Sequence, residues 1–282
     1  MHAYTSLNNA VYSTVRFGQM ERFGGIERLY GKKAMEKFRH AHVCVVGIGG
    51  VGSWIVEALA RSGIGHITMI DLDEICITNI NRQLHAMDGE IGKQKTSAMA
   101  DRIRAINPDC KIIALEAFFS HRNANEILDQ GFDYVIDAID RVQSKSLLLD
   151  GCHKRNIPVI SCGGAGGLRD PSKIHIDDIS RCYNDSLMNQ VRRNLRTKYG
   201  FPMGADPKRK IKARKFYIDC IFSSESPVYQ QCDGEVSTEK PKNMADEGRR
   251  LNCMSGYGSI THMTATFGFF AVSKCLDKLA SV

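Results

Sequence analysis

A glycine-rich segment and a nearby acidic residue have the spacing of a nucleotide-binding site. Four glycines lie in residues 47–52, the glycine loop: Gly47, Gly49, Gly50 and Gly52. The loop follows a short β-branched run and opens a stretch with helical spacing, so its backbone can approach a phosphate at a helix N-terminus. Asp71 ends the next predicted strand, where its carboxylate can accept hydrogen bonds from ribose hydroxyls. These residues predict nucleotide binding but fit a dinucleotide cofactor as well as ATP, and a tight turn without a ligand is a further alternative.

Polar and cationic residues after Asp71 help to distinguish these nucleotides. In chain order they are Asp73, Asn79, Arg82, Gln83 and Lys95. A dehydrogenase needs no extra cation cluster, whereas an enzyme that transfers an adenylyl group must stabilise negative charge that builds on the α-phosphate. We expect Arg82 and Lys95 to supply that positive charge and Asn79 to donate an amide hydrogen bond.

Asp140 follows the fourth predicted strand and is expected at the same sheet edge as the glycine loop. There its carboxylate can hold the Mg²⁺ of ATP, directly or through water. Ordinary roles exist for each residue, because Asp140 could cap the following helix and Arg82 or Lys95 could be solvated surface charges. Their joint occurrence at the carboxyl ends of successive strands favours catalysis of adenylyl transfer.

The elements that must position these residues alternate between strand and helix. Short apolar runs predict strands over 42–47, 66–71, 111–115, 134–137 and 158–161. Helical spacing separates them over 50–62, 92–107, 120–130 and 141–156. Strands joined by helices of this length form parallel βαβ units. The fold class is therefore α/β, a doubly wound, Rossmann-like and mostly parallel sheet.

The pattern changes after the glycines of 163–167. Strands are predicted over 173–179 and 216–222, as an antiparallel extension of the sheet, with a helix over 185–199 between them. We expect one domain over 1–282. Its parts are a nucleotide-binding core at about 20–165, a basic insert at about 181–215, a crossover loop at about 224–250 and a C-terminal helix at about 256–280.

Positive charge is concentrated in the basic insert. It has eleven Lys and Arg residues and two acids, a net charge of +9, while the whole chain carries +7. Such asymmetry indicates a polyanionic partner, although a solvated loop is an alternative. The candidate phosphate contacts are Arg192, Arg193, Arg196, Lys208, Arg209, Lys210 and Lys212.

Composition makes membrane and exported proteins poor matches. The 282 residues contain no apolar run of about 18 residues and no apolar leader at the N-terminus. None of the ten cysteines stands in a C-x-x-C pair, so we expect reduced thiols rather than a zinc site. We therefore expect a cytoplasmic protein, and packing of the C-terminal apolar stretch as a closing helix is favoured over membrane contact.

In this order and spacing, the residues resemble the ubiquitin-activating-enzyme superfamily of adenylating enzymes, which includes the ThiF/MoeB-like and HesA proteins. The matching elements are the glycine loop, Asp71-x-Asp73, Asn79-x-x-Arg82-Gln83, Lys95 and Asp140, over about residues 20–165. Three further segments are similar to the tRNA threonylcarbamoyladenosine dehydratases: RFGGIERLYG at 22–31, FYIDCIFS at 216–223 and the tail at 255–268. They extend the resemblance over nearly the whole chain.

The resemblance implies an ATP-dependent adenylating ligase or cyclase (EC 6.1 type) that acts on tRNA. The threonine carboxylate of a modified adenosine next to the anticodon would attack MgATP and give an acyl-adenylate and pyrophosphate. Ring closure to an oxazolone or a hydantoin would then release AMP, with net loss of one water. A homodimer and a cysteine-desulfurase or sulfur-acceptor partner are implied in the same way.

Two positions depart from the superfamily pattern or lack a role. An arginine that reaches the partner subunit's site in many members corresponds here to Gly25, and Arg22 is a candidate substitute. Cys232 lies where ubiquitin-type enzymes keep a thioester cysteine, but cyclisation requires no enzyme thiol, which favours a structural or unreactive cysteine.

Three other functions fit part of the pattern. Adenylation of the C-terminus of a ubiquitin-like or sulfur-carrier protein uses the same chemistry, but enzymes of that subfamily usually carry C-x-x-C pairs. An NAD-binding oxidoreductase fits the glycine loop and Asp71 alone. A non-catalytic module that binds ATP and RNA fits the charge asymmetry, but Arg82, Lys95 and Asp140 favour catalysis.

Overall fold

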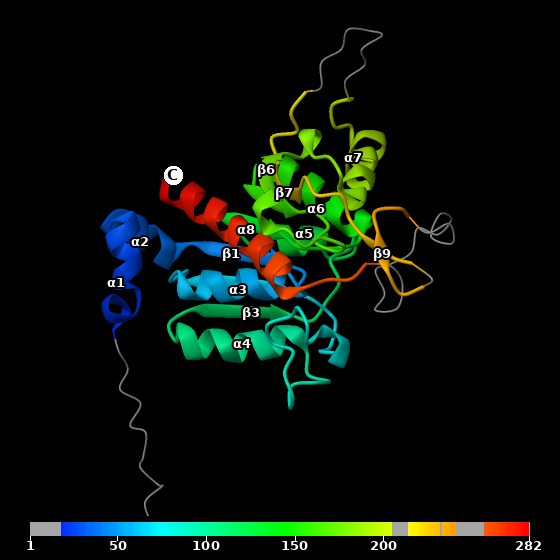
Figure 1. Ribbon diagram of the computed structural model, residues 1–282. Coiled ribbons are helices and arrows are strands. Elements are labelled where there is room, and N and C mark those ends of the chain that lie inside the picture. The colour runs from blue at the N-terminus through cyan, green and yellow to red at the C-terminus, as the bar shows by residue number, and fades with distance from the viewer. Residues whose placement is uncertain (1–17, 205–213, 232, 241–256, 282) are drawn as a thin grey trace, which may run out of the picture.

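The protein is built around a seven-stranded, mostly parallel sheet. A computed structural model describes residues 18–204, 214–231, 233–240 and 257–281. The strand order is β3-β2-β1-β4-β5-β7-β6, and only β6 pairs antiparallel, with β7. Figure 1 shows β3 towards the bottom of the view and β6 towards the top. The strands are β1 (His42–Val46), β2 (His66–Ile70), β3 (Lys111–Leu115), β4 (Tyr134–Asp137), β5 (Val159–Cys162), β6 (Ile174–Asp178) and β7 (Asp219–Ser223). A separate hairpin pairs β8 (Tyr229–Gln230) with β9 (Val236–Ser237).

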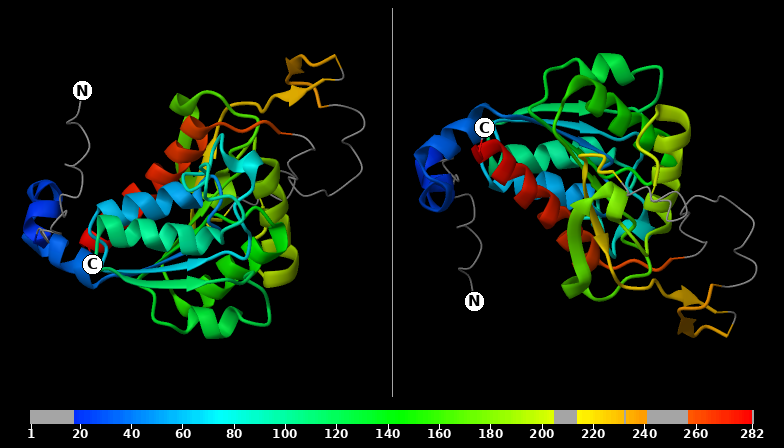
Figure 2. Two further views of the ribbon diagram at one scale, coloured as in Figure 1. Left: turned by 90° about the horizontal axis from the view of Figure 1, so that it is seen from below. Right: turned by 90° about the horizontal axis from the view of Figure 1, so that it is seen from above.

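Helices cover both faces of the sheet (Figure 2). One face carries α3 (Gly52–Arg61), α4 (Lys95–Ile106) and α8 (Thr261–Ser281), with α1 (Gln19–Tyr30) and α2 (Lys32–His40) at its border. The other carries α5 (Ala124–Leu128), α6 (Val142–Arg155) and α7 (Ser186–Tyr199). Short 3-10 helices are η1 (Ile77–Asn79), η2 (Pro171–Lys173) and η3 (Ile179–Arg181).

The central strand β1 shows why these runs form buried strands. All five of its residues are buried. Val43 and Val45 belong to the core under α3, α4 and α8, whereas Cys44 and Val46 belong to the core under α5 and α6. Side chains alternate between the two faces with a period of two residues. Because both faces are covered, the strand is a continuous apolar run, as is typical of parallel sheets.

Strand order also defines where a ligand can bind. The strand β2, which follows β1 in the chain, lies on one side of β1, and β4 lies on the other. The order of the strands therefore reverses at β1. In open α/β sheets such a point opens a crevice at the carboxyl ends of the strands. The glycine loop, Asp71 and Asp140 follow β1, β2 and β4, and therefore lie at this carboxyl edge.

The predicted fold class is confirmed, with three differences of detail. The second of the two later strands was expected to be antiparallel, but β7 runs parallel to β5, and only β6 reverses direction. The segment 216–218 does not join the strand, because Tyr217 has a φ of +59° and the ladder begins at Asp219. The sequence did not predict helices α1 and α2. It also did not predict the β8–β9 hairpin, which lies inside the predicted crossover loop.

The C-terminal helix packs as expected. α8 begins at Thr261 and contributes Met263, Phe267 and Cys275 to the core shared with α3. A Cβ on Gly268 would lie 3.1 Å from the Val51 carbonyl oxygen, so a small residue lets α8 approach the start of α3 closely. In the part of the chain that the structure describes, no helix has both the length and the apolar character needed to cross a membrane.

A pair of stacked histidines at the start of β1 and β2 predicts acid sensitivity of the fold. The His42 and His66 rings lie 3.5 Å apart, and His42 accepts or donates a 2.8 Å hydrogen bond with Thr68. Burial, and then the charge of His66, lower the pKa of His42 from 6.5 to about 4. The unfolded chain therefore binds this proton first, and stability falls as the pH drops from 6.5 towards 4.

We expect His42→Gln, which can keep the bond to Thr68, to flatten the dependence of the melting temperature on pH across this window. The exposed His121 provides the matched control, and His121→Gln should retain the wild-type slope. Equal slopes for both variants would show that the stacked pair does not cause the acid sensitivity.

Candidate functional site

Two glycines of the glycine loop are required by close approach of backbone atoms. Gly47 has a φ of +91°, and a Cβ there would lie 2.7 Å from the Ala138 carbonyl oxygen. A Cβ on Gly52 would lie 1.8 Å from the Gly47 carbonyl oxygen. Gly49 and Gly50 instead face the side chains of Gln83 and Arg82. The last residue of the loop, Gly52, is also the first residue of α3. At this helix N-terminus, free N–H groups and the helix dipole favour an anion such as phosphate.

Asp71 joins the glycine loop to the segment after β2. Its carboxylate accepts the N–H of Ile48 at 2.6 Å with one oxygen and the N–H of Asp73 at 2.8 Å with the other. A carboxylate has about four lone-pair positions, so both oxygens can accept further bonds. The geometry fits the predicted role of Asp71 at a ribose and adds a second role in shaping the loop.

Lys95 is linked to the same segment by a partly buried ion pair. Its Nζ lies 3.0 Å from the Asp73 carboxylate, and only 5% of Lys95 is exposed. Lys95 is the first residue of α4, an end of a helix where a positive charge is unfavourable. Asp73 offsets this cost while two Nζ–H donors of the ammonium stay available. Lys95 is therefore connected to the glycine loop through Asp73 and Asp71.

Arg82 and Gln83 lie over the glycine loop. The Arg82 Cγ atom would be 3.3 Å from a Cβ on Gly50, and Arg82 Nη1 donates to the carbonyl of Thr78 at 2.7 Å. Gln83 is 7% exposed, and its Oε1 has no hydrogen-bond partner among the described residues. Buried polar atoms are normally paired, so this orphan acceptor next to Gly49 is typical of a ligand site.

Asn79 has a structural role that the sequence did not indicate. It is 5% exposed in η1, and its Oδ1 accepts the N–H of Cys76 at 3.1 Å. The bond stabilises the turn that precedes Arg82. An additional contact between Asn79 and a nucleotide stays a prediction.

His85 is a buried residue of the site that sequence reasoning missed. It is 2% exposed, its Nε2 lies 2.9 Å from the Ile48 carbonyl oxygen, and its Nδ1 has no partner among the described residues. Burial lowers the pKa of His85, so the ring is neutral and donates its Nε2–H to that carbonyl. The glycine loop is thus held at Ile48 from two directions, by Asp71 at the N–H and by His85 at the carbonyl. In the sequence, only its position two residues after Gln83 indicated that His85 could belong to the site.

Asp140 is exposed at the end of a turn that a buried ion pair holds in place. Lys145 Nζ lies 2.9 Å from the Asp137 carboxylate, and both side chains are fully buried. Lys145 Nζ also donates to the Ile139 carbonyl at 2.9 Å, and the Ile139 N–H donates back to Asp137 at 3.1 Å. The Ser161 hydroxyl donates to the same carboxylate at 2.7 Å. The turn that carries Asp140 is therefore fixed through both polar groups of Ile139.

The site fits a magnesium ion held mainly by the nucleotide. Within the described ranges, no three His, Cys, Asp or Glu side chains gather into a metal-binding group. Mg²⁺ usually binds through one or two carboxylates, water and substrate phosphates. The exposed carboxylate of Asp140 is consistent with that ligand set.

Three of the candidate phosphate contacts of the basic insert, all on α7, lie in the part of the chain that the structure describes, and one of these three is not on the surface. Arg192 is 9% exposed and donates to the carbonyls of Ile179 and Cys182. These hydrogen bonds connect α7 to η3 and the residue after it. We therefore withdraw it as a phosphate contact. Arg193 is exposed, whereas Arg196 bonds to the Pro202 carbonyl at 3.1 Å and lies over a phenyl ring. Outside the described residues lie Lys208, Arg209, Lys210, Lys212 and Cys232.

Neither N-terminal position supplies an arginine to the site of its own chain. Gly25 is an exposed residue of α1, and Arg22 donates to the carbonyl of Ile106 at the end of α4. That end of α4 precedes β3 and lies at the amino edge of the sheet. A contact between Arg22 and a second subunit stays a prediction.

Comparisons with known proteins agree with this geometry. A family model described as the ThiF family matches residues 25–281. The chain is 49% identical over 259 residues to a Haemophilus influenzae protein named tRNA threonylcarbamoyladenosine dehydratase, covering 92% of this chain and 93% of the relative. A structure named TcdA (CsdL) is 42% identical with a TM-score of 0.82, over 93% of this chain and 95% of that one. The Escherichia coli tRNA N6-threonylcarbamoyladenosine dehydratase in complex with ATP has a TM-score of 0.78 at 40% identity, with the same coverage.

The ion pair behind Asp140 predicts a large effect of a buried substitution. Lys145→Met leaves the Asp137 carboxylate buried without its cation, and breaking such a pair costs about 3–5 kcal/mol. We expect that loss in the free energy of unfolding from urea denaturation. The double variant Lys145→Met with Asp137→Asn should recover part of it, because no unpaired charge is left. A single variant as stable as the wild type would contradict the role of the pair.

Proposed function

This chain belongs to the ThiF family, and from that premise we propose that it catalyses the ATP-dependent dehydration of N6-threonylcarbamoyladenosine in tRNA, next to the anticodon. The observation that carries the proposal is the convergence of the glycine loop with two cations. Hydrogen bonds link Ile48 to Asp71, Asp71 to Asp73 and Asp73 to Lys95. Arg82 lies against Gly50. The names of the relatives support tRNA as the substrate.

The first step forms an acyl-adenylate. An oxygen of the threonine carboxylate attacks the α-phosphorus of ATP, the bond to the β-phosphate breaks, and pyrophosphate leaves with the bonding electrons. The glycine loop and the N-terminus of α3 bind the phosphates, and Asp71 accepts from the ribose. Arg82 and Lys95 stabilise the negative charge that develops on the phosphate oxygens. Bound magnesium, held at Asp140, would add to that charge neutralisation.

The second step closes a ring within the nucleoside. A nitrogen or oxygen of the neighbouring ureido group attacks the acyl carbon, the bond to AMP breaks, and the nucleophile's proton is released. The nucleoside loses one water in total, because one carboxylate oxygen leaves on the phosphate of AMP and two protons leave, one from the carboxyl group and one from the ring-closing nucleophile. Because nucleophile and electrophile belong to one molecule, proximity accelerates this step without an enzyme nucleophile. No thiol, including Cys232, is needed.

Finer features follow from the resemblance and complete the proposal. We place the enzyme among ATP-dependent ligases of the cytoplasm, as a homodimer that receives Arg22 or another residue from the partner subunit. A sulfur-acceptor or cysteine-desulfurase partner belongs to the same set. Adenylation of a ubiquitin-like or sulfur-carrier protein is the alternative for this site. It is distinguished by pyrophosphate release that depends on a small protein with a Gly-Gly tail rather than on tRNA.

Removal of either charged group should stop adenylation without unfolding the protein. We expect Arg82→Ala and Asp140→Ala each to lower the rate of tRNA-dependent AMP formation by about 100-fold or more. Melting temperatures should stay close to that of the wild type. Matched controls are Arg104→Ala and Asp101→Ala, exposed partners of one ion pair on α4, which should keep full activity. Near-normal turnover in either site variant would contradict the proposed role of that residue in adenylation.

The basic insert should contribute a salt-dependent part of tRNA affinity. Replacing Lys208, Arg209 and Lys210 by Gln should weaken tRNA binding and reduce the slope of log affinity against log salt by about 2–3. Affinity for ATP should not change. The control replaces Lys32 and Lys33, exposed on α2, and should leave the slope unaltered. If the triple variant keeps the wild-type slope, tRNA binds through another surface.

A further inference from the structure

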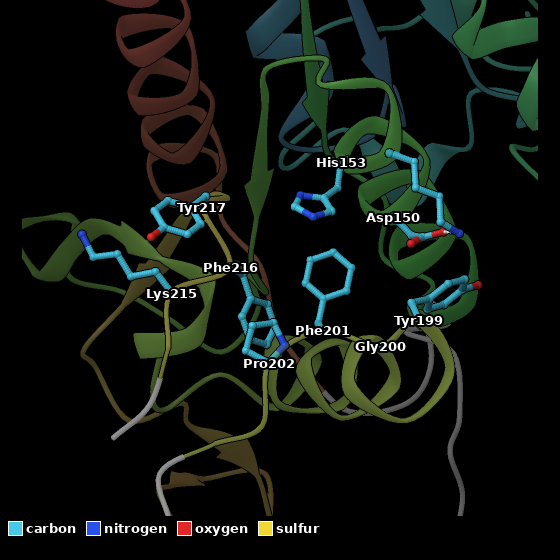
Figure 3. Close-up of a pocket in the computed structure, with 10 residues that line it drawn as sticks. Asp150, His153, Tyr199, Gly200, Phe201, Pro202, Lys215, Phe216 and Tyr217 are labelled. Atoms are coloured by element: carbon cyan, nitrogen blue, oxygen red, sulfur yellow. Dashed lines mark hydrogen bonds and ion pairs between the residues drawn. The ribbon is translucent and has the colours of Figure 1, made fainter. Parts of the chain in front are cut away.

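A cavity of about 290 Å³, shown in Figure 3, lies at the edge of the sheet opposite the glycine loop. It forms where the ends of α6 and α7 meet the segment that precedes β7, and we call it the amino-edge pocket. Its lining includes His153, Tyr199, Phe201, Lys215, Phe216 and Tyr217. The volume is near the lower limit for small-molecule sites, which suits a single planar group.

The floor of the amino-edge pocket is a fixed set of aromatic rings. Phe201 is 6% exposed, and its ring lies 4.9 Å from His153 and 5.1 Å from Phe216. The close-up shows Tyr217 and Lys215 on one side of these rings and Tyr199 on the other (Figure 3). The pocket thus combines a rigid apolar floor with accessible aromatic and cationic groups at its rim.

Tyr217 is held at the rim in an unfavourable conformation. Its side chain is 86% exposed, and its φ of +59° lies in the left-handed region that a bulky residue seldom adopts. The Asp178 carboxylate accepts the N–H of Tyr217 at 2.7 Å and that of Phe216 at 3.0 Å, which fixes this backbone. The same carboxylate also accepts the N–H of Ser180 at 2.9 Å, so it ties this segment to η3. A strained backbone that the surrounding structure holds in place is typical of a functional position.

The charged residues of the pocket lining are two lysines and one carboxylate, Lys154, Lys215 and Asp150. Lys215 follows the exposed Arg214 and lies on one side, and Lys154 lies on the other, 6.0 Å from the Tyr199 ring. Lys154 also pairs with the buried Asp150 at 2.7 Å, so its ammonium is held at the rim. Accessible aromatic rings beside cations form the usual platform for unpaired bases, with the rings stacking on bases and the cations contacting phosphates.

The amino-edge pocket is separate from the proposed adenylation site. α6 ends at Arg155, shortly before β5, and Tyr217 precedes β7, so both lie at the amino ends of strands parallel to β1. The glycine loop follows the carboxyl end of β1, and a five-residue strand spans about 17 Å. A base in this pocket is therefore a different nucleotide from the one that reacts.

We propose that the amino-edge pocket binds an unpaired base of the tRNA substrate, which stacks on Tyr217 with its phosphate facing Lys215. The tRNA is the substrate of the proposed function, on which this inference rests. It adds a base contact to the phosphate contacts of the basic insert. Recognition through stacking selects an unpaired nucleotide and tolerates different bases.

Tyr217→Gly tests the proposal without depending on a damaged fold. Glycine adopts a φ of +59° readily, so this variant should melt at the same or a higher temperature than the wild type. We expect it to bind a tRNA anticodon arm on the order of 10-fold more weakly than the wild type, in fluorescence anisotropy. Tyr217→Phe keeps the ring and should stay within about twofold of the wild type. Tyr183→Ala removes another exposed tyrosine and serves as the control.

An RNA duplex of equal length, without unpaired bases, should bind wild type and Tyr217→Gly equally. Unchanged affinity of Tyr217→Gly for the anticodon arm would overturn the proposal that the amino-edge pocket binds a base, even if the enzyme dehydrates tRNA normally. If the wild type releases no AMP with tRNA, yet its RNA affinity depends on Tyr217, then the proposed function fails and the pocket stands.

Discussion

The buried ion pair between Asp137 and Lys145 fixes the turn on which the geometry of the site depends. The pair holds the peptide groups of Ile139, and the carbonyl of the preceding Ala138 presses against Gly47 so closely that only glycine fits there. A displacement of this turn would therefore move the glycine loop as well as Asp140. A well-packed apolar pair could stabilise the fold equally, because desolvation offsets much of the attraction between buried charges. It could not, however, hold the carbonyl of Ile139.

The two charged regions of the molecule lie at opposite edges of one sheet. Arg82 and Lys95 are next to the glycine loop at the carboxyl edge, whereas Lys215 and the amino-edge pocket lie at the amino ends of the strands. A short carrier-protein tail at the glycine loop would have no use for cations about one strand length away. A tRNA is large enough to contact both edges. This arrangement is consistent with the proposed polynucleotide substrate, whose reacting nucleotide would lie at the carboxyl edge and whose other contacts would lie at the amino edge.

Local sequence signals predicted the parts of the site that are themselves local. The glycine loop, Asp71 and Asp140 follow apolar runs that could only be buried strands, and the structure places all three at one edge. Lys145 and Arg192 could not be assigned in this way, because a cation within an amphipathic helix has the same sequence pattern whether it is solvated or buried. Their partners, Asp137 in one case and the carbonyls of Ile179 and Cys182 in the other, are brought near only by the fold. The direction of β7 was likewise decided by pairing with β5, not by its own residues.

The central claim is that the carboxyl-edge site activates a carboxylate of tRNA with ATP. The direct measurement incubates the protein with ATP, Mg²⁺ and tRNA that contains threonylcarbamoyladenosine, digests the tRNA and determines the masses of its nucleosides. We predict a product one water lighter than threonylcarbamoyladenosine, with AMP released in equal amount. An unchanged nucleoside mass, with ATP still bound by the protein, would contradict it.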